Sequence, residues 1–131
     1  MSQTYEDRPT LEQWNELMQV AAATQRIAVG TYTGDGTYGA SNPKSLTFSF
    51  EPKLVLVYCP TNVPGNTAGM ALLARGLEEA LAINSNTTSS NSSCFHALTV
   101  AWSGNTVSWY RNDDKDMFNA NGFLYYYCAI G

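Results

Sequence analysis

The stretch that decides the fold runs from Gly104 to Gly131: G-N-T-V-S-W-Y-R (104–111), N-D-D-K-D-M-F-N-A-N-G (112–122) and F-L-Y-Y-Y-C-A-I-G (123–131). The first part follows a tight turn and alternates polar with apolar residues, which predicts the second strand of a hairpin over 106–110. The last part is an apolar, aromatic run that predicts a strand over 123–130. Since this strand is expected to be buried, the C-terminus is expected to lie inside a finished β-domain.

Short β-runs separated by Gly, Asn and Ser turns continue upstream of this stretch. Further strands are predicted over 26–33, 44–50, 54–59, 70–75 and 97–102. The segment 76–84 suits either a helical turn or a strand, and we favour a strand. About seven or eight short strands with frequent turns are typical of a sandwich. We therefore predict a mainly β protein with one antiparallel, jelly-roll-like β-sandwich over 26–131, preceded by a segment, 1–25, that contains one short helix.

The N-terminal segment contains the clearest helix of the sequence. Thr10 and Gln13 form the T-x-x-Q pattern of a capping box, which predicts a helix start at Leu11. Apolar residues then recur at helical spacing at Leu11, Trp14, Leu17 and Met18. A helix of about 13 residues is marginal alone, so this face is expected to dock. The alternatives are its own β-domain, sister copies of the helix, or another protein. We predict an anchor or oligomer interface made of Tyr5, Leu11, Trp14, Leu17 and Met18.

Composition narrows the classes of function. Only 14% of the residues are charged, against about 25% in a typical domain, and the net charge is −4. Nucleic-acid binding needs clustered Lys and Arg, whereas the 7 basic residues here are scattered. The N-terminus lacks the apolar core of a signal peptide, and no apolar run approaches the roughly 20 residues of a membrane span. We expect synthesis in a cytoplasm, no nucleic-acid partner and no membrane insertion.

No motif predicts catalysis or a bound cofactor. G-D-G-T-Y-G (34–39) matches a dinucleotide fingerprint, but a proline and a β-run follow it where a helix is required, so we interpret it as a β-turn. Cys59, Cys94 and Cys128 are odd in number and widely spaced, which favours buried thiols, with a single bridge left open. His96, the only histidine, has no positioned nucleophile beside it. We predict that the protein is not an enzyme and holds no cofactor or metal.

Two polar loops are candidate ligand-facing surfaces. The residues expected to face a ligand are Asn86, Thr87, Asn91, Asp113, Asp114, Asp116 and Asn119. The three aspartates could hold Ca²⁺ through their carboxylates, but the spacing of an EF-hand loop is absent, so a solvated loop is the favoured interpretation. The aromatic residues of the final strands serve either as core and subunit interface or as a platform on which sugars stack.

Four segments resemble a known class of domain. They are I-A-V-G-T-Y-T-G-D-G-T-Y-G (27–39), F-S-F-E-P-K-L-V-L-V-Y (48–58), S-W-Y (108–110) and F-L-Y-Y-Y-C-A-I-G (123–131). Together they resemble the small C-terminal β-domains of bacteriophage tail fibres and related head-fibre or virion surface proteins. The resemblance spans about 27–131. It implies a β-sandwich module, commonly trimeric, that sits on a virion and often touches a host surface.

The resemblance yields three hypotheses of function. The first is a virion surface protein, a homotrimer whose N-terminal segment binds other virion proteins of the capsid or tail and whose loops bind host-surface glycan. The second is a decoration or head-fibre protein that stabilises the particle and binds no ligand. The third is a cellular carbohydrate-binding module, which the missing signal peptide and the lack of a partner catalytic domain disfavour.

Overall fold

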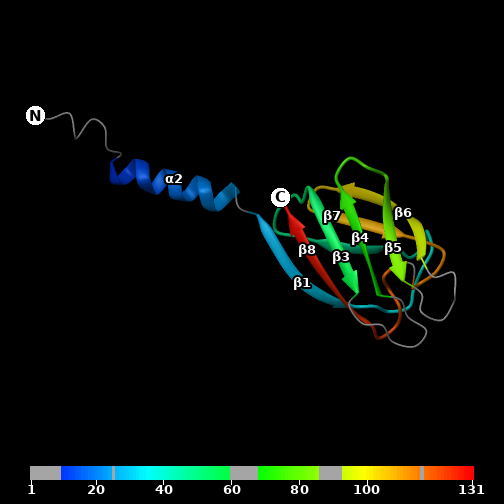
Figure 1. Cartoon of the computed structure of the whole chain (residues 1–131). Helices are drawn as coiled ribbons and strands as arrows, with labels where there is room; N and C mark the ends of the chain where they lie inside the picture. The colour runs from blue at the N-terminus through cyan, green and yellow to red at the C-terminus, as the bar shows by residue number, and fades with distance from the viewer. Residues whose placement is uncertain (1–9, 25, 60–67, 86–92, 116) are drawn as a thin grey trace, which may run out of the picture.

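The computed structural model describes residues 10–24, 26–59, 68–85, 93–115 and 117–131, which form one α-helix and eight β-strands (Figure 1). The elements are α2 (Leu11–Thr24), β1 (Ile27–Thr33), β2 (Lys44–Thr47), β3 (Leu54–Cys59), β4 (Ala68–Ala74), β5 (Glu79–Ser85), β6 (Ser93–Ser103), β7 (Thr106–Tyr110) and β8 (Leu124–Ile130). The predicted mainly β fold with one short N-terminal helix is confirmed.

The eight strands hydrogen-bond into one antiparallel sheet, in the order β1-β8-β3-β4-β5-β6-β7-β2. The sheet curls, and β6 and β7 cross behind β3, β4 and β5 (Figure 1). β6 changes partner along its length: it pairs with β5 up to Thr99 and with β7 from Thr99 onwards. Two separate packed sheets, as predicted for a sandwich, are therefore not confirmed, because this long strand keeps both parts of the sheet continuous.

The core lies inside the curl, where strand alternation directs every second side chain. Fully buried side chains come from the front strands and from the strands behind them. They include Val55, Val57, Leu73, Leu98, Val107, Trp109 and Tyr125. The rings of Tyr32 and Tyr125 stack with their centroids 5.2 Å apart. The buried strands thus meet across one continuous core.

Most predicted strands are present, with shifted ends. β3 and β7 begin and end where the sequence predicts, at 54–59 and 106–110. The ambiguous segment 76–84 forms a turn at Gly76, with a φ of 93°, and then β5. β2 ends at Thr47 rather than at 50, yet Phe48 and Phe50 remain buried beyond it.

The predicted capping box forms at the start of α2. The Thr10 N–H donates to Gln13 Oε1 at 2.8 Å, and the Gln13 N–H donates to Thr10 Oγ1 at 3.1 Å. These two bonds satisfy donors that the first turn of a helix leaves without partners. The helix then extends away from the sheet (Figure 1).

Candidate functional site: an uncovered apolar face

The outward surface of the curled sheet has two halves of different chemistry. On β6, β7 and β2 the outward positions other than Tyr110 carry small or hydroxylated side chains. This hydroxyl face consists of Thr99, Ala101, Ser103, Thr106, Ser108, Ser45 and Thr47. The hydroxyls of Thr47 and Thr106 lie 2.8 Å apart and bond across the two strands. Such a surface is suited to water.

On β1, β8, β3, β4 and β5 the described outward side chains are mostly apolar, the exceptions being Thr31, Thr33 and Glu79. We call this surface the apolar face: Ile27, Val29, Leu54, Leu56, Tyr58, Met70, Leu72, Leu81, Ile83, Leu124, Tyr126, Cys128 and Ile130. Leu72 near its centre is 50% exposed, and Val29 on the outermost strand is 74% exposed. Glu79, at the border with the hydroxyl face, is the only charged residue at an outward position of the five strands as far as the structure describes them.

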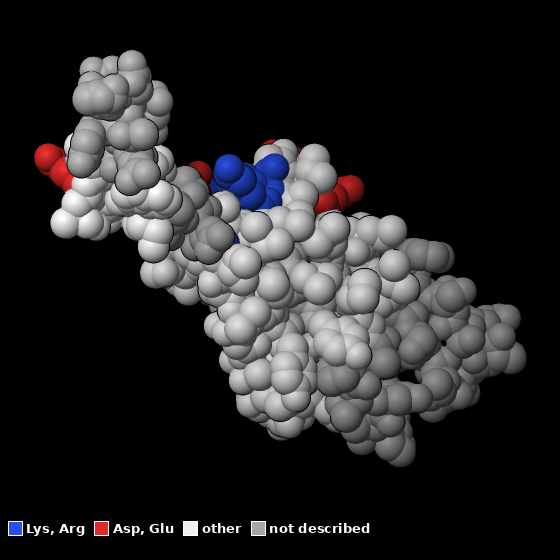
Figure 2. All heavy atoms as spheres, turned by 60° about the vertical axis from the view of Figure 1, so that its left-hand side comes forward, with Lys and Arg blue, Asp and Glu red and all other residues white. Residues whose placement is uncertain are grey.

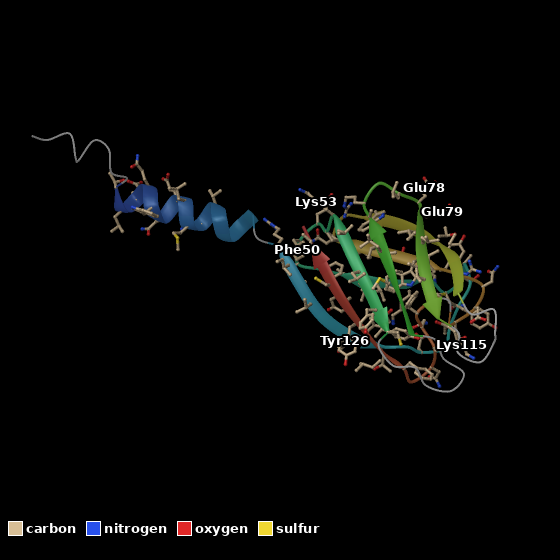
Figure 3. All side chains as sticks on the ribbon, in the orientation of Figure 1. Phe50, Lys53, Glu78, Glu79, Lys115 and Tyr126 are labelled. Atoms are coloured by element: carbon tan, nitrogen blue, oxygen red, sulfur yellow. The ribbon has the colours of Figure 1, made fainter. Side chains whose placement is uncertain are left out.

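The strand register makes this face continuous. Val29 lies opposite Cys128, Cys128 opposite Leu56, and Leu56 opposite Leu72, so one apolar row crosses four strands. Neighbouring outward residues across a strand pair lie close enough to touch. Figure 2 shows one face of the molecule, on which a broad surface of uncharged residues lies below a group of charged side chains at the upper edge. The labelled Tyr126 in Figure 3 projects from β8 to the outside of the sheet.

The cause lies in the sequence of the front strands. β3 reads L-V-L-V-Y-C, apolar at every position, whereas β7 reads T-V-S-W-Y and alternates. A strand that is apolar on both sides is typical of a sheet covered on both faces. In the single chain only the inward side of β3 is covered, because no described element packs on its outward side. The apolar face is therefore uncovered by any described element of the chain.

The helix presents a second uncovered apolar surface. Leu11, Trp14, Leu17 and Met18 are all more than half exposed, as every described side chain from 10 to 20 is exposed. Figure 3 shows that α2 and its side chains extend away from the sheet. Of the three partners predicted for the helix, its own β-domain does not cover residues 10–20. Sister copies or another protein remain as predictions.

The loop between β7 and β8 fills the open end of the core. Its residues Met117, Phe118, Asn119 and Ala120, which we call the plug, are each at most 2% exposed. Three aromatic side chains hold the plug backbone. Trp109 Nε1 donates to the Met117 carbonyl at 2.7 Å, Tyr32 OH donates to the Phe118 carbonyl at 2.8 Å, and the Tyr125 hydroxyl accepts from the Ala120 N–H at 3.0 Å. Burial strongly raises the pKa of Tyr32, so its hydroxyl stays a donor.

Asn119 does not face a ligand, so that prediction is wrong. Its Nδ2 donates to Asp35 Oδ1 at 2.7 Å and to the Thr37 carbonyl at 2.8 Å, and its Oδ1 accepts from the Asp35 N–H at 3.3 Å. Donors from the Thr37 side chain and backbone, with the Asn119 amide, lower the pKa of Asp35 from 3.8 to about 2. The side chain thus ties the plug to the loop after β1 and has no polar atom left for a ligand.

The other predicted loop residues divide into two groups. Asp113 is exposed and accepts the Lys115 N–H at 2.8 Å, while burial and the neighbouring Asp113 raise the pKa of Asp114. Among the described residues, no three His, Cys, Asp or Glu side chains converge to hold a metal ion. The predicted residues that lie outside the described part of the chain are Tyr5, Asn86, Thr87, Asn91 and Asp116.

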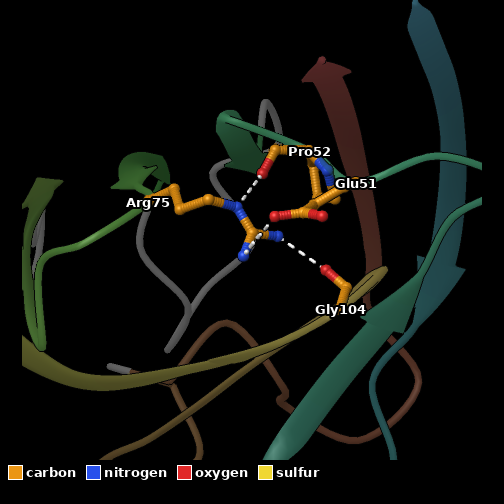
Figure 4. Close-up of polar contacts among 4 residues, drawn as sticks. All are labelled: Glu51, Pro52, Arg75 and Gly104. Atoms are coloured by element: carbon orange, nitrogen blue, oxygen red, sulfur yellow. Dashed lines mark hydrogen bonds and ion pairs between the residues drawn. The ribbon is translucent and has the colours of Figure 1, made fainter.

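Arg75 marks a hollow that the sequence did not predict. Its guanidinium donates to the Pro52 and Gly104 carbonyls, each at 2.6 Å, and pairs with Glu51 at 3.3 Å (Figure 4). It also lies over the Trp102 ring, 4.8 Å from its centroid. The adjacent hollow, of about 530 Å³, is lined by Leu77, Glu78, Thr99 and Trp102 among others. Because its donors bind two other loops, Arg75 acts as a clamp between turns.

Comparisons with known proteins identify no relative: no family model, curated protein or solved structure matches the chain. Among the described residues, no helix is long and apolar enough to cross a membrane.

Proposed function

We propose that this chain is a structural protein of a bacteriophage virion surface that assembles as a homotrimer. One observation carries the self-assembly: the apolar face is continuous over five strands and has no cover among the described residues of the chain. The phage assignment rests on the resemblance of 27–131 to fibre and head-fibre domains. In this proposal the protein is a structural component that is exposed on the surface of the virion, and no residue has a catalytic role.

The N-terminal segment anchors the protein to other virion proteins. The exposed stripe Leu11, Trp14, Leu17 and Met18 supports this role, since an uncovered apolar stripe needs a partner surface. The capping box gives the helix its start without help from the β-domain. The anchor thus starts as a local helix and is completed by its partner.

We propose that the curled sheet acts as the predicted sandwich does, with two layers that belong to one sheet. The front strands β1, β8, β3, β4 and β5 form one layer, and β6, β7 and β2 form the other, with the core between them. In a sandwich, loops connect two separate sheets, whereas here β6 runs from one layer into the other. The layers place the apolar face and the hydroxyl face on opposite sides of the domain.

The display function is binding of host-surface glycan by the polar loops predicted from the sequence. The predicted ligand loops contain asparagine, threonine and aspartate, whose amide and hydroxyl groups suit sugar hydroxyls. The second candidate is a decoration protein that binds no ligand. Incubation of fluorescently labelled protein with a glycan array and with whole bacteria separates the two. Binding to neither favours decoration.

The oligomeric state is the primary test. Light scattering on the full chain is expected to give about 43 kDa, three times the 14.3 kDa of one chain. A variant that begins at Thr24 retains every residue of the buried core and reports whether α2 is needed for assembly. A monomeric full chain at high concentration would remove the main support for the proposal and favour a lone binding module.

A further inference from the structure

We infer that copies of this chain meet through the apolar face, so that the β-domain assembles without α2. This inference rests on the proposed function, because it presumes self-association and names the surface responsible. The occupant is a second copy of the same chain. The exposed apolar residues of α2 are then available to bind other virion proteins.

The hydroxyl face is an internal control for this argument. Both faces belong to one sheet and use outward positions of antiparallel strands, so strand propensity alone would give them similar side chains. Yet Ala101 and Ser108 lie opposite each other on one half, while Leu56 and Leu72 lie opposite each other on the other. The difference follows from what each half faces. The hydroxyl half faces water, and the apolar half faces protein.

The size of the apolar face suits an interface between copies. Five strands about 4.8 Å apart and four outward rows about 6.8 Å apart span about 24 Å by 27 Å, or about 650 Å². The largest apolar patch of a typical monomer is about 300–600 Å². A stable interface takes about 800 Å² from each partner. The apolar face with its margins approaches that area.

Charge favours a second copy over a different partner. The chain carries a net charge of −4, which would keep copies apart if acidic groups met. Among the described residues, Glu79 is the only acidic residue at an outward position of the five strands, and it lies with Glu78 at one end of β5, at the border of the face (Figure 3). Contact through the centre of the apolar face therefore brings no described acidic residues together. A glycan or a charged partner would leave its side chains unmatched.

The outermost strand of the apolar face supports the same conclusion. β1 ends the sheet, is seven residues long, and has no charged residue between Ile27 and Thr33. The strand at the other end, β2, has four residues and begins with Lys44. Proteins usually protect a sheet edge with short strands or charge. β2 has this protection, whereas β1 lacks it and is covered when copies meet.

The test compares matched variants of the full chain by light scattering across a dilution series. Leu72→Glu places a charge at the centre of the apolar face, and Ala101→Glu places the same charge on the hydroxyl face. Leu72→Glu is expected to raise the dissociation constant of the assembly about 30-fold or more, because it removes a central residue of the interface. Ala101→Glu is expected to leave it unchanged. Trp14→Ser in α2 is also expected to leave it unchanged.

A second readout uses Cys128, a thiol on the apolar face. In wild-type protein, alkylation of Cys128, followed by mass spectrometry of its peptide, is expected to slow strongly at concentrations where copies assemble. This readout decides the question even if Leu72→Glu fails to fold.

The outcomes separate the inference from the proposed function. A wild-type chain that is monomeric overturns both. An assembled chain that survives Leu72→Glu, dissociates with Trp14→Ser and leaves Cys128 reactive overturns the inference alone, because the helices then form the seam.

Discussion

Removal of the Asn119 side chain tests how the plug is held. In Asn119→Ala, two good hydrogen bonds disappear: one to the ionised Asp35 at 2.7 Å and one to the Thr37 carbonyl at 2.8 Å. A bond to a charged group contributes about 1.5–3 kcal/mol and a neutral one about 1 kcal/mol. Because Asp35 is exposed and water can replace part of its bond, we take the lower part of this range. The expected loss is about 2.5 kcal/mol of unfolding free energy.

The unfolding free energy lost in Asn119→Ala is expected to become smaller at low pH. The pKa of Asp35 is lowered on folding from 3.8 to about 2. Its contribution is therefore present above pH 3.8 and is lost as the pH falls toward 2. Since part of that contribution comes from Asn119, the difference between wild type and Asn119→Ala shrinks over this window.

Urea unfolding at about pH 7 and about pH 2.5, followed by tryptophan fluorescence, measures both effects. Asn121→Ala is the control, because Asn121 is exposed on the same loop, and it is expected to cost less than about 0.5 kcal/mol. A cost below about 1 kcal/mol for Asn119→Ala, or a difference that does not change with pH, would refute the role of these two bonds in holding the plug.

Three further predictions concern the backbone, the core and the helix. Gly34→Ala is expected to lower the unfolding free energy by more than about 3 kcal/mol, because a Cβ at this position collides with the plug backbone. Gly39→Ala is expected to cost only about 1–2 kcal/mol, because its Cβ meets open space and only the positive φ is unfavourable. Thermal unfolding of the two variants compares these costs. Trp109→Phe leaves a buried plug carbonyl without its donor and is expected to cost about 2–3 kcal/mol in urea unfolding; a neutral result would mean that water replaces the indole. Thr10→Ala removes the cap and is expected to lower the helical circular dichroism signal while the melting temperature of the β-domain stays constant.

Local patterns in the sequence were sufficient for most strands. β3 and β7 were predicted to the residue, because a proline ends the first and a tight turn starts the second. The capping box at Thr10 was predicted for the same reason: its two hydrogen bonds join residues three positions apart. Such features depend on neighbours along the chain.

Features that depend on distant residues were less accessible. The segment 76–84 satisfies both helical and strand spacing, and its pairing with β4 and β6 selects the strand. The single sheet depends on the 11-residue length of β6, of which the sequence predicted only 97–102. Asn119 sits in a polar loop and looks like a surface residue, but its partner Asp35 lies 84 positions away.

The sequence predicted the strands that form the apolar face, but it did not predict that one side of them would be uncovered. A continuous apolar run such as that of β3 is typical of a strand in the middle of a sheet, which is where β3 lies. The run could not show which side would remain uncovered, because that requires the register with β8 and β4. The contrast between β3 and β7 was the available clue, since one is apolar on both sides and the other alternates.

The position of β8 has a consequence for how the protein is made. β8 lies between β1 and β3, and it is the last of the eight strands to leave the ribosome. Until residues 124–130 emerge, β1 has no neighbour to pair with, and β3 shows an open edge on that side. A nascent chain that has not yet reached residues 124–130 therefore carries two strands with unpaired edges. Ribosome-bound chains that stop just before Leu124 should depend on chaperones that hold unfolded chains far more than chains that include residues 124–130 do.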